Sequence, residues 1–224
     1  MRTAVYIDGY NLYYGLLKNS AYKWLNMHGL FGYLINEQNP SSELVECNFY
    51  TALTKSKLAS RGEKSVQSQQ VYHRALESVH TPPVRVVCYS YALEPKPMVA
   101  FREGTPPAKT DRHMVWHTSE KKCDVCLAMS AYRSAASGQV DQIVIVSNDT
   151  DFEPLLEAIR DDFPRVVRGV ISPRRPNGGR PASAGLGARA HWMRHHVSED
   201  ELARYQFPDR VPTRKRPATK PDYW

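Results

Sequence analysis

Short apolar runs alternate along this chain with longer segments of helical spacing, and this alternation limits the fold more than any other feature. The run 142–146 (QIVIV) is the clearest buried strand, and 3–7, 45–53, 84–89 and 166–171 are further strand candidates. Strands that are joined through helices pair in parallel, with helices on both faces of the sheet. The sequence therefore predicts an α/β fold with three layers, α/β/α, around a central, mostly parallel sheet.

Segments of helical spacing lie between these runs, and each is long enough for two or more turns. Leu12, Leu16 and Leu17 recur at helical intervals in the first segment. The last segment is amphipathic and tolerates Pro154 in its opening turn. An extra strand is also expected at 113–117. The helices are expected at residues 11–18, 24–35, 63–79, 122–137 and 151–160.

A single domain accounts for most of the chain, and two shorter segments follow it. At 224 residues the chain is long enough for one α/β domain with an appendage. Residues 1–172 form the predicted domain, which a proline-rich insertion interrupts at 92–120. Residues 173–207 are expected to form an Arg-rich loop, a short strand and a helix that opens with a capping box at Ser198. Residues 208–224 are expected to be a mobile basic tail.

The composition is that of an ordinary globular protein, with 42% hydrophobic and 24% charged residues. No apolar run approaches the ~20 residues that cross a bilayer, and the first strand begins too early to leave room for a signal peptide. We therefore expect a cytoplasmic protein without a membrane partner. Cys123 and Cys126 lack the second ligand pair of a zinc site, so they are expected on a buried helix.

The formal net charge is +7, and its distribution along the chain is uneven. Residues 164–198 contain seven arginines and no acidic residue. The guanidinium fork matches pairs of phosphate oxygens, so Arg174, Arg175 and Arg180 are candidate contacts to the phosphates of RNA. The alternative is a solvated basic loop with no ligand.

Acidic residues follow two of the predicted strands and begin one predicted helix. Asp8 comes directly after the first strand, Asp149 and Asp151 come directly after 142–146, and Asp124 opens a helix. Ligands of an open α/β sheet bind beyond the carboxyl ends of its strands, so these side chains are expected to meet at one edge. Crowded carboxylates repel one another and need a cation or a shifted pKa. Oxygen ligands without clustered His or Cys favour Mg²⁺ or Mn²⁺.

Two neutral side chains complete this predicted metal site. Asn11 lies one helical turn past Asp8 and is expected to orient that carboxylate or a phosphate oxygen. Ser147 is expected to hold a metal-bound water. Such ions activate water for attack on a phosphodiester. The alternative for each aspartate alone is a turn former or helix N-cap, and only their convergence on one edge favours a site.

Three motifs carry a resemblance to a known family. The motifs are V-Y-I-D-G-Y-N at 5–11, K-C-D-V-C-L-A at 122–128 and I-V-S-N-D-T-D-F at 145–152, and they resemble the acidic motifs of NYN domains, in particular the LabA-like branch. This resemblance covers about residues 1–172 and implies a PIN-like fold, divalent metal ions and endoribonuclease activity. It assigns catalytic roles to Asp8, Asn11, Asp124, Asp149 and Asp151.

The third motif departs from the family pattern. It usually reads Ser-Gly-Asp, whereas this chain has Asn148 in place of the glycine. The replacement is expected to be tolerated if residue 148 adopts a left-handed backbone. No carboxylate is lost.

The sequence therefore predicts a metal-dependent endoribonuclease that cuts single-stranded RNA. The alternative is a non-catalytic RNA-binding or assembly module that keeps the fold. A haloacid-dehalogenase-type phosphatase is disfavoured because Tyr10 stands where its second aspartate is required, and a dinucleotide-binding domain lacks its glycine-rich turn. Activity on single-stranded DNA and assembly as a homodimer are left open.

Overall fold

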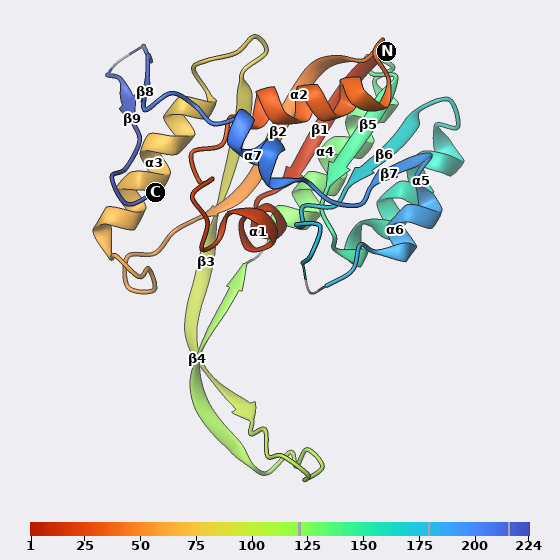
Figure 1. Cartoon of the computed structure of the whole chain (residues 1–224). Helices are drawn as coiled ribbons and strands as arrows, with labels where there is room; N and C mark the ends of the chain where they lie inside the picture. The colour runs from red at the N-terminus through yellow and green to blue at the C-terminus, as the bar shows by residue number, and fades with distance from the viewer. Residues whose placement is uncertain (121, 179, 215) are drawn as a thin grey trace.

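A seven-stranded sheet organises the computed structural model, which describes residues 1–120, 122–178, 180–214 and 216–224. The strand order is β4-β3-β2-β1-β5-β6-β7, and every neighbouring pair is parallel except β3 and β4 (Figure 1). The predicted α/β fold with a mostly parallel sheet is confirmed. The strands are β1 (Arg2–Asp8), β2 (Glu43–Leu53), β3 (Val84–Val99), β4 (Arg112–Glu120), β5 (Gln142–Val146), β6 (Val167–Ile171) and β7 (Trp192–Arg194).

The helices agree with the predicted segments to within a few residues, except the short helix at Ala184–Arg189, which forms where a loop was expected. Asn26 caps α2, because its side chain accepts a hydrogen bond from the N–H of Gly29 at 3.0 Å. The predicted capping box is present at the start of α7, between Ser198 and Glu201. The helical elements are α1 (Gly9–Leu12), the π-helical turn η1 (Tyr13–Leu17), α2 (Met27–Gln38), α3 (Glu63–Leu76), α4 (Cys123–Ala136), the 3-10 turn η2 (Thr150–Phe152), α5 (Glu153–Asp162), α6 (Ala184–Arg189) and α7 (Glu199–Arg204).

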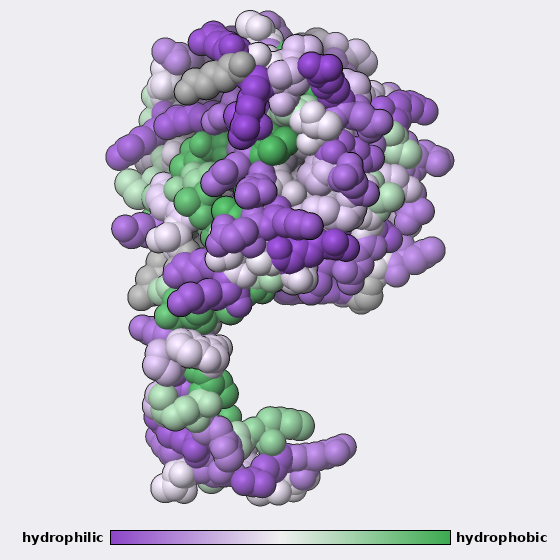
Figure 2. All heavy atoms as spheres, turned by 90° about the vertical axis from the view of Figure 1, so that its left-hand side faces the viewer, coloured by the Kyte–Doolittle hydropathy of each residue, from purple (hydrophilic) through white to green (hydrophobic). Residues whose placement is uncertain are grey.

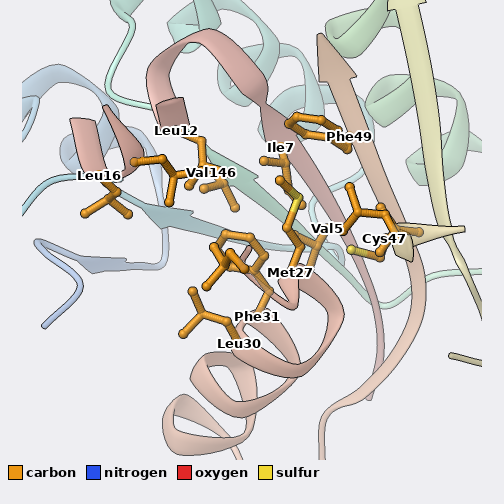
Figure 3. Close-up of a cluster of buried hydrophobic side chains, with 14 of the residues drawn as sticks. Val5, Ile7, Leu12, Leu16, Met27, Leu30, Phe31, Cys47, Phe49 and Val146 are labelled. Atoms are coloured by element: carbon orange, nitrogen blue, oxygen red, sulfur yellow. The ribbon is translucent and has the colours of Figure 1, made fainter. Parts of the chain in front are cut away.

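The central strand β1 is buried on both faces, which makes the molecule three layers thick. Val5 and Ile7 point into the cluster formed with α1, η1, α2, α3 and α7 (Figure 3). Ala4 and Tyr6 point into the opposite cluster, formed with α4, α5 and α6. Because side chains alternate along a strand, an unbroken apolar run such as this one requires cover on both sides.

The predicted insertion at 92–120 is a long β-hairpin that projects from the body (Figure 1). β3 pairs with β2 as far as Ser90 and with β4 from Tyr91 onward. The strand expected at 113–117 is the middle of β4. The hairpin exposes large apolar side chains, including Phe101 at 92% and Trp116 at 69%. Figure 2 shows apolar surface along this arm.

The C-terminal segment packs against the body, so the prediction of a mobile tail is wrong. Val211 and Ala218 are buried and pair across a short antiparallel hairpin of β8 (Arg210–Val211) and β9 (Ala218–Thr219). The ring of Trp224 lies against Trp24, with centroids 6.1 Å apart. Apolar residues between the prolines supply the packing that a count of prolines and charges does not anticipate.

Two further features bear on the site. No helix among the described residues is both long and apolar enough to span a bilayer. Gly15, in η1, lies directly against the backbone carbonyl of Pro173, where a Cβ would overlap that oxygen. This contact holds the loop that follows β6 against η1.

Candidate functional site

The strand order places the first acidic residue at the point where the sheet changes direction. β1 lies between β2 and β5, and Ile7 is paired with Val146. Asp8 and Ser147 therefore leave the same edge side by side, and the Ser147 hydroxyl donates to Asp8 Oδ2 at 2.8 Å. This is the edge at which open α/β sheets bind ligands.

The Asp8 carboxylate is buried, and all of its acceptor positions are used. Its Oδ1 accepts from the backbone N–H groups of Tyr10 at 3.0 Å and Asn11 at 3.1 Å. Its Oδ2 accepts from Asn11 Nδ2 at 2.6 Å and from Ser147. Asp8 thus acts as the N-cap of α1, and Asn11 and Ser147 hold its second oxygen in place.

Asp149 lies close enough to act on Asp8 electrostatically. Burial raises the pKa of the Asp8 carboxyl, hydrogen bonds from Asn11 and Ser147 lower it, and the negative charge of Asp149 raises it. The N–H of Asp149 donates to Ser147 Oγ at 3.0 Å, and its Oδ1 accepts from the N–H of Asp151 at 3.1 Å. The structure thus connects four of the predicted site residues through Ser147.

The other two predicted carboxylates lie on the surface. Asp124 is exposed in the first turn of α4, which packs beside η2, and Asp151 is exposed within η2. In the described parts of the chain, no group of three or more His, Cys, Asp or Glu side chains is arranged to hold a metal ion. These residues therefore show no preformed metal cluster, and the predicted four-carboxylate metal centre stays a prediction. A metal ion also does not fit directly on Asp8 in this arrangement, because four hydrogen bonds already occupy the lone pairs of its carboxylate oxygens.

Asn148 has a structural role that the motif comparison missed. It does not adopt the left-handed backbone that we expected, since Asn19 and Lys122 are the non-glycine residues with positive φ in the described chain. Its amide instead holds the loop after β6. Asn148 Nδ2 donates to the carbonyl of Pro181 at 2.9 Å, and Oδ1 accepts from Ser183 N at 2.7 Å. An amide side chain two residues before a helical turn, directly after a buried strand, is the signal that would have indicated this anchor.

Two of the three arginines predicted to bind phosphate instead make contacts within the protein. Arg174 donates to the backbone carbonyls of Arg180 at 2.8 Å and Gly178 at 2.7 Å. Arg175 pairs with Glu199 at 3.3 Å. Arg180 is exposed and forms no ion pair with any described residue. Acceptors from the loop and from α7 thus engage the guanidinium groups of the first two, and the phosphate role of all three arginines stays a prediction.

A cavity of about 480 Å³ opens beside the Asp8 edge, and sequence reasoning did not anticipate it. Its wall includes residues of α1, the end of β2, the following loop, α3 and the C-terminal segment. His73 lines it, and burial lowers the pKa of this imidazole to about 4, so the ring is neutral near pH 7. Because the wall is assembled from distant segments, no single stretch of sequence carries a pattern for it.

Comparison with known families agrees with the acidic motifs. A model described as the NYN domain matches residues 2–180. The chain belongs to the NYN domain family. The resemblance inferred from the motifs is therefore confirmed at the level of the family. This NYN domain also has the central parallel sheet and flanking helices that the resemblance implied.

One curated relative and one solved structure are similar to this chain. The chain is 37% identical over 240 residues to 6-hydroxy-3-succinoylpyridine 3-monooxygenase HspA from Pseudomonas putida, covering 100% of the chain and 75% of that protein. A protein of unknown function from Vibrio parahaemolyticus matches in structure with a TM-score of 0.49 and 18% identity. That match covers 89% of this chain and 94% of the other.

Proposed function

We propose that this NYN domain is an endoribonuclease that hydrolyses phosphodiester bonds in single-stranded RNA at the Asp8 edge. The observation that carries the proposal is the linkage of Asp8, Asn11, Ser147 and Asp149 at the switch point of the sheet. Membership of the NYN family supports a nuclease-like fold. The LabA-like branch remains part of the proposal.

The two central carboxylates take different roles in this proposal. Asp8 is saturated with hydrogen bonds and acts as a positioning residue, because it holds Ser147 and through it Asp149. Asp149 is only partly buried, so its carboxylate can accept the proton of a water that attacks phosphorus. The water oxygen forms the new bond to phosphorus as the bond to the ribose oxygen breaks, and the leaving ribose oxygen takes a proton from solvent water. Asp124 and Asp151 add negative charge near the same edge.

Dependence on Mg²⁺ or Mn²⁺ belongs to the proposal because the NYN resemblance implies it. The arrangement around Asp8 offers no open coordination position. Cleavage should therefore be measured with each ion added separately and with a chelator. Activity that is unchanged by the chelator removes the metal from the proposal and leaves the assignment of the edge intact.

Replacement of Asp149 by Asn tests the proposal directly. Cleavage of single-stranded RNA should fall by about 100-fold or more, since general-base catalysis contributes roughly that factor. Asp200→Asn is the matched control, because Asp200 is exposed on α7. Equal cleavage by Asp149→Asn and the wild type would contradict the proposal. RNA that is bound but left uncut by the wild type would favour the non-catalytic module.

Asp8→Asn tests whether Asp8 positions the site residues or only stabilises the fold. Its raised pKa means that charge on Asp8 costs stability, and this cost appears as the pH rises through that pKa. Asn removes the charge and its Oδ1 still caps the helix, but its NH₂ group cannot accept the bonds that Asn11 and Ser147 donate to Oδ2. The two effects oppose each other, so the melting temperature at pH 7 should change little while cleavage falls. A large drop in melting temperature would assign a purely structural role to Asp8.

A second candidate is hydroxylation of a pyridine, suggested by the printed name of the relative from Pseudomonas putida. The identity of 37% across the whole chain and the cavity beside Asp8 favour it. The assay is consumption of 6-hydroxy-3-succinoylpyridine in the presence of O₂ and a two-electron donor such as NADH. Consumption of this compound without RNA cleavage would replace the nuclease proposal.

A further inference from the structure

The cavity beside the Asp8 edge has the dimensions and the wall of a ligand site. Its volume of about 480 Å³ lies within the usual range for small-molecule sites in proteins, roughly 300–1,000 Å³. Gly9 and Tyr10 contribute to its wall, and the N–H of Tyr10 also supports Asp8. The cavity and the proposed reacting edge therefore share one turn of the chain.

The wall is rich in flat aromatic side chains from separate parts of the chain. Tyr13 comes from η1, Phe49 from β2, Tyr72 from α3 and Trp224 from the C-terminal segment. Tyr10 and Tyr14 also line the cavity, and their rings lie 4.4 Å apart, each about half exposed. Aromatic faces of this kind bind planar rings by stacking.

The charged side chains of the described wall are both lysines. Lys23 and Lys55 line the cavity, and neither forms an ion pair with a described residue. No aspartate or glutamate belongs to the described lining. Two unpaired ammonium groups beside an aromatic wall favour a ligand with negative charge.

Two polar side chains of the wall, Gln69 and Tyr72, are held by the protein itself. Gln69 accepts from Thr54 N at 2.8 Å and donates to the carbonyl of Ala52 at 2.9 Å. The hydroxyl of Tyr72 donates to the carbonyl of Leu25 at 2.7 Å. These bonds fix the frame of the cavity and leave the lysines for a ligand.

We propose that this cavity binds a planar heteroaromatic ring that carries an anionic group. The ring stacks on the aromatic wall, and Lys23 and Lys55 contact the anion. Two sources have this chemistry: one nucleotide of an RNA chain that passes Asp8, and a free pyridine acid. The inference rests on the proposed function only for the first of these sources.

Calorimetric titration of the full chain tests the proposal with four probes. Uridine 5′-monophosphate and nicotinic acid each have both a ring and an anion, whereas ribose 5-phosphate lacks the heteroaromatic ring and 3-methylpyridine lacks the anion. At least one of the first two should bind about tenfold more tightly than the probe that lacks its ring or its charge. Equal binding of each complete probe and its partial counterpart would overturn the proposal, as would failure of both complete probes to bind.

A pair of charge reversals in one loop supplies the matched control. Lys55→Glu should weaken binding of the complete probe by about tenfold or more, because it places a negative charge in the wall. Lys57→Glu makes the same change two residues away at an exposed position outside the wall, and it should alter affinity by less than about twofold. Equal losses in the two variants would mean a general charge effect and would reject the site.

The probes also identify the source and separate this proposal from the nuclease assignment. Preference for uridine 5′-monophosphate assigns the cavity to RNA, and preference for nicotinic acid assigns it to a free pyridine acid. Asp149→Asn lies outside the wall and should leave probe binding unchanged. If the protein binds a probe but does not cut RNA, the nuclease proposal is rejected and the proposed ligand site is retained.

Discussion

Two basic regions of this NYN domain differ in what their charges contact. The Arg-rich segment, residues 164–198, holds seven arginines, but Arg174 donates to loop carbonyls and Arg189 pairs with two glutamates of α5. The cavity wall holds Lys23 and Lys55, which pair with no described residue. A count of charges along the sequence therefore does not show which charges are available to a ligand, since that depends on neighbours in space.

Acidification should affect the cavity region most strongly. His73 is neutral in the folded protein because burial lowers its pKa to about 4, while the unfolded chain takes up the proton near pH 6.5. The free energy of unfolding should therefore fall between pH 6.5 and 4, by about 3 kcal/mol from this residue. His28, whose pKa burial also lowers to about 4, adds to the slope.

Urea titrations across that pH range measure the effect. His73→Phe should flatten the pH dependence, whereas replacement of the exposed His195 by Gln should not. An identical slope in wild type and His73→Phe would mean that the cavity wall does not set the acid sensitivity.

The Arg-rich segment should respond to mutation through stability. Arg189 contacts Glu153 at 3.0 Å and Glu157 at 2.7 Å and donates to the carbonyl of Gly185 at 3.0 Å. Arg189→Ala should lower the free energy of unfolding by about 1 kcal/mol, because partly exposed ion pairs contribute modestly. Arg180→Ala should have an effect below about 0.5 kcal/mol. Equal losses would show that Arg180 also has a structural partner.

RNA affinity gives the smallest expected difference. Arg180→Ala should weaken RNA binding about twofold to threefold and reduce the salt dependence by about one phosphate contact, since this side chain is exposed. Arg174→Ala should leave the salt slope unchanged. Fluorescence anisotropy at several salt concentrations measures both. A reduced slope for Arg174→Ala would restore the phosphate role that its contacts argue against.

Much of the fold could be predicted because its evidence is local in sequence. The run QIVIV and the helical segments around it were sufficient to predict a parallel sheet. The length of β3 was not predictable in this way, because Pro95 and Pro97 normally end a strand. They are tolerated because β2 pairs with β3 only as far as Ser90, so the outer edge of the hairpin has no strand partner that needs their N–H groups.

The same distinction between evidence that is local in sequence and evidence that is not applies to the candidate site. Asp8, Ser147 and Asp149 follow strands directly, so their meeting at one edge could be inferred from strand order alone. The partners of the arginines could not be inferred, because Glu153 and Glu199 lie outside the basic segment. The saturation of the Asp8 carboxylate depends on hydrogen-bond geometry, which motif spacing does not specify.

The contact between Gly15 and Pro173 has a consequence for mutational scanning. Gly15 is exposed to solvent, and a scan guided by burial would rank it among the tolerant positions. Any side chain there would overlap the carbonyl of Pro173 and separate the first helix from the loop that follows β6. Substitution at this exposed position should therefore be as damaging as substitution in the core.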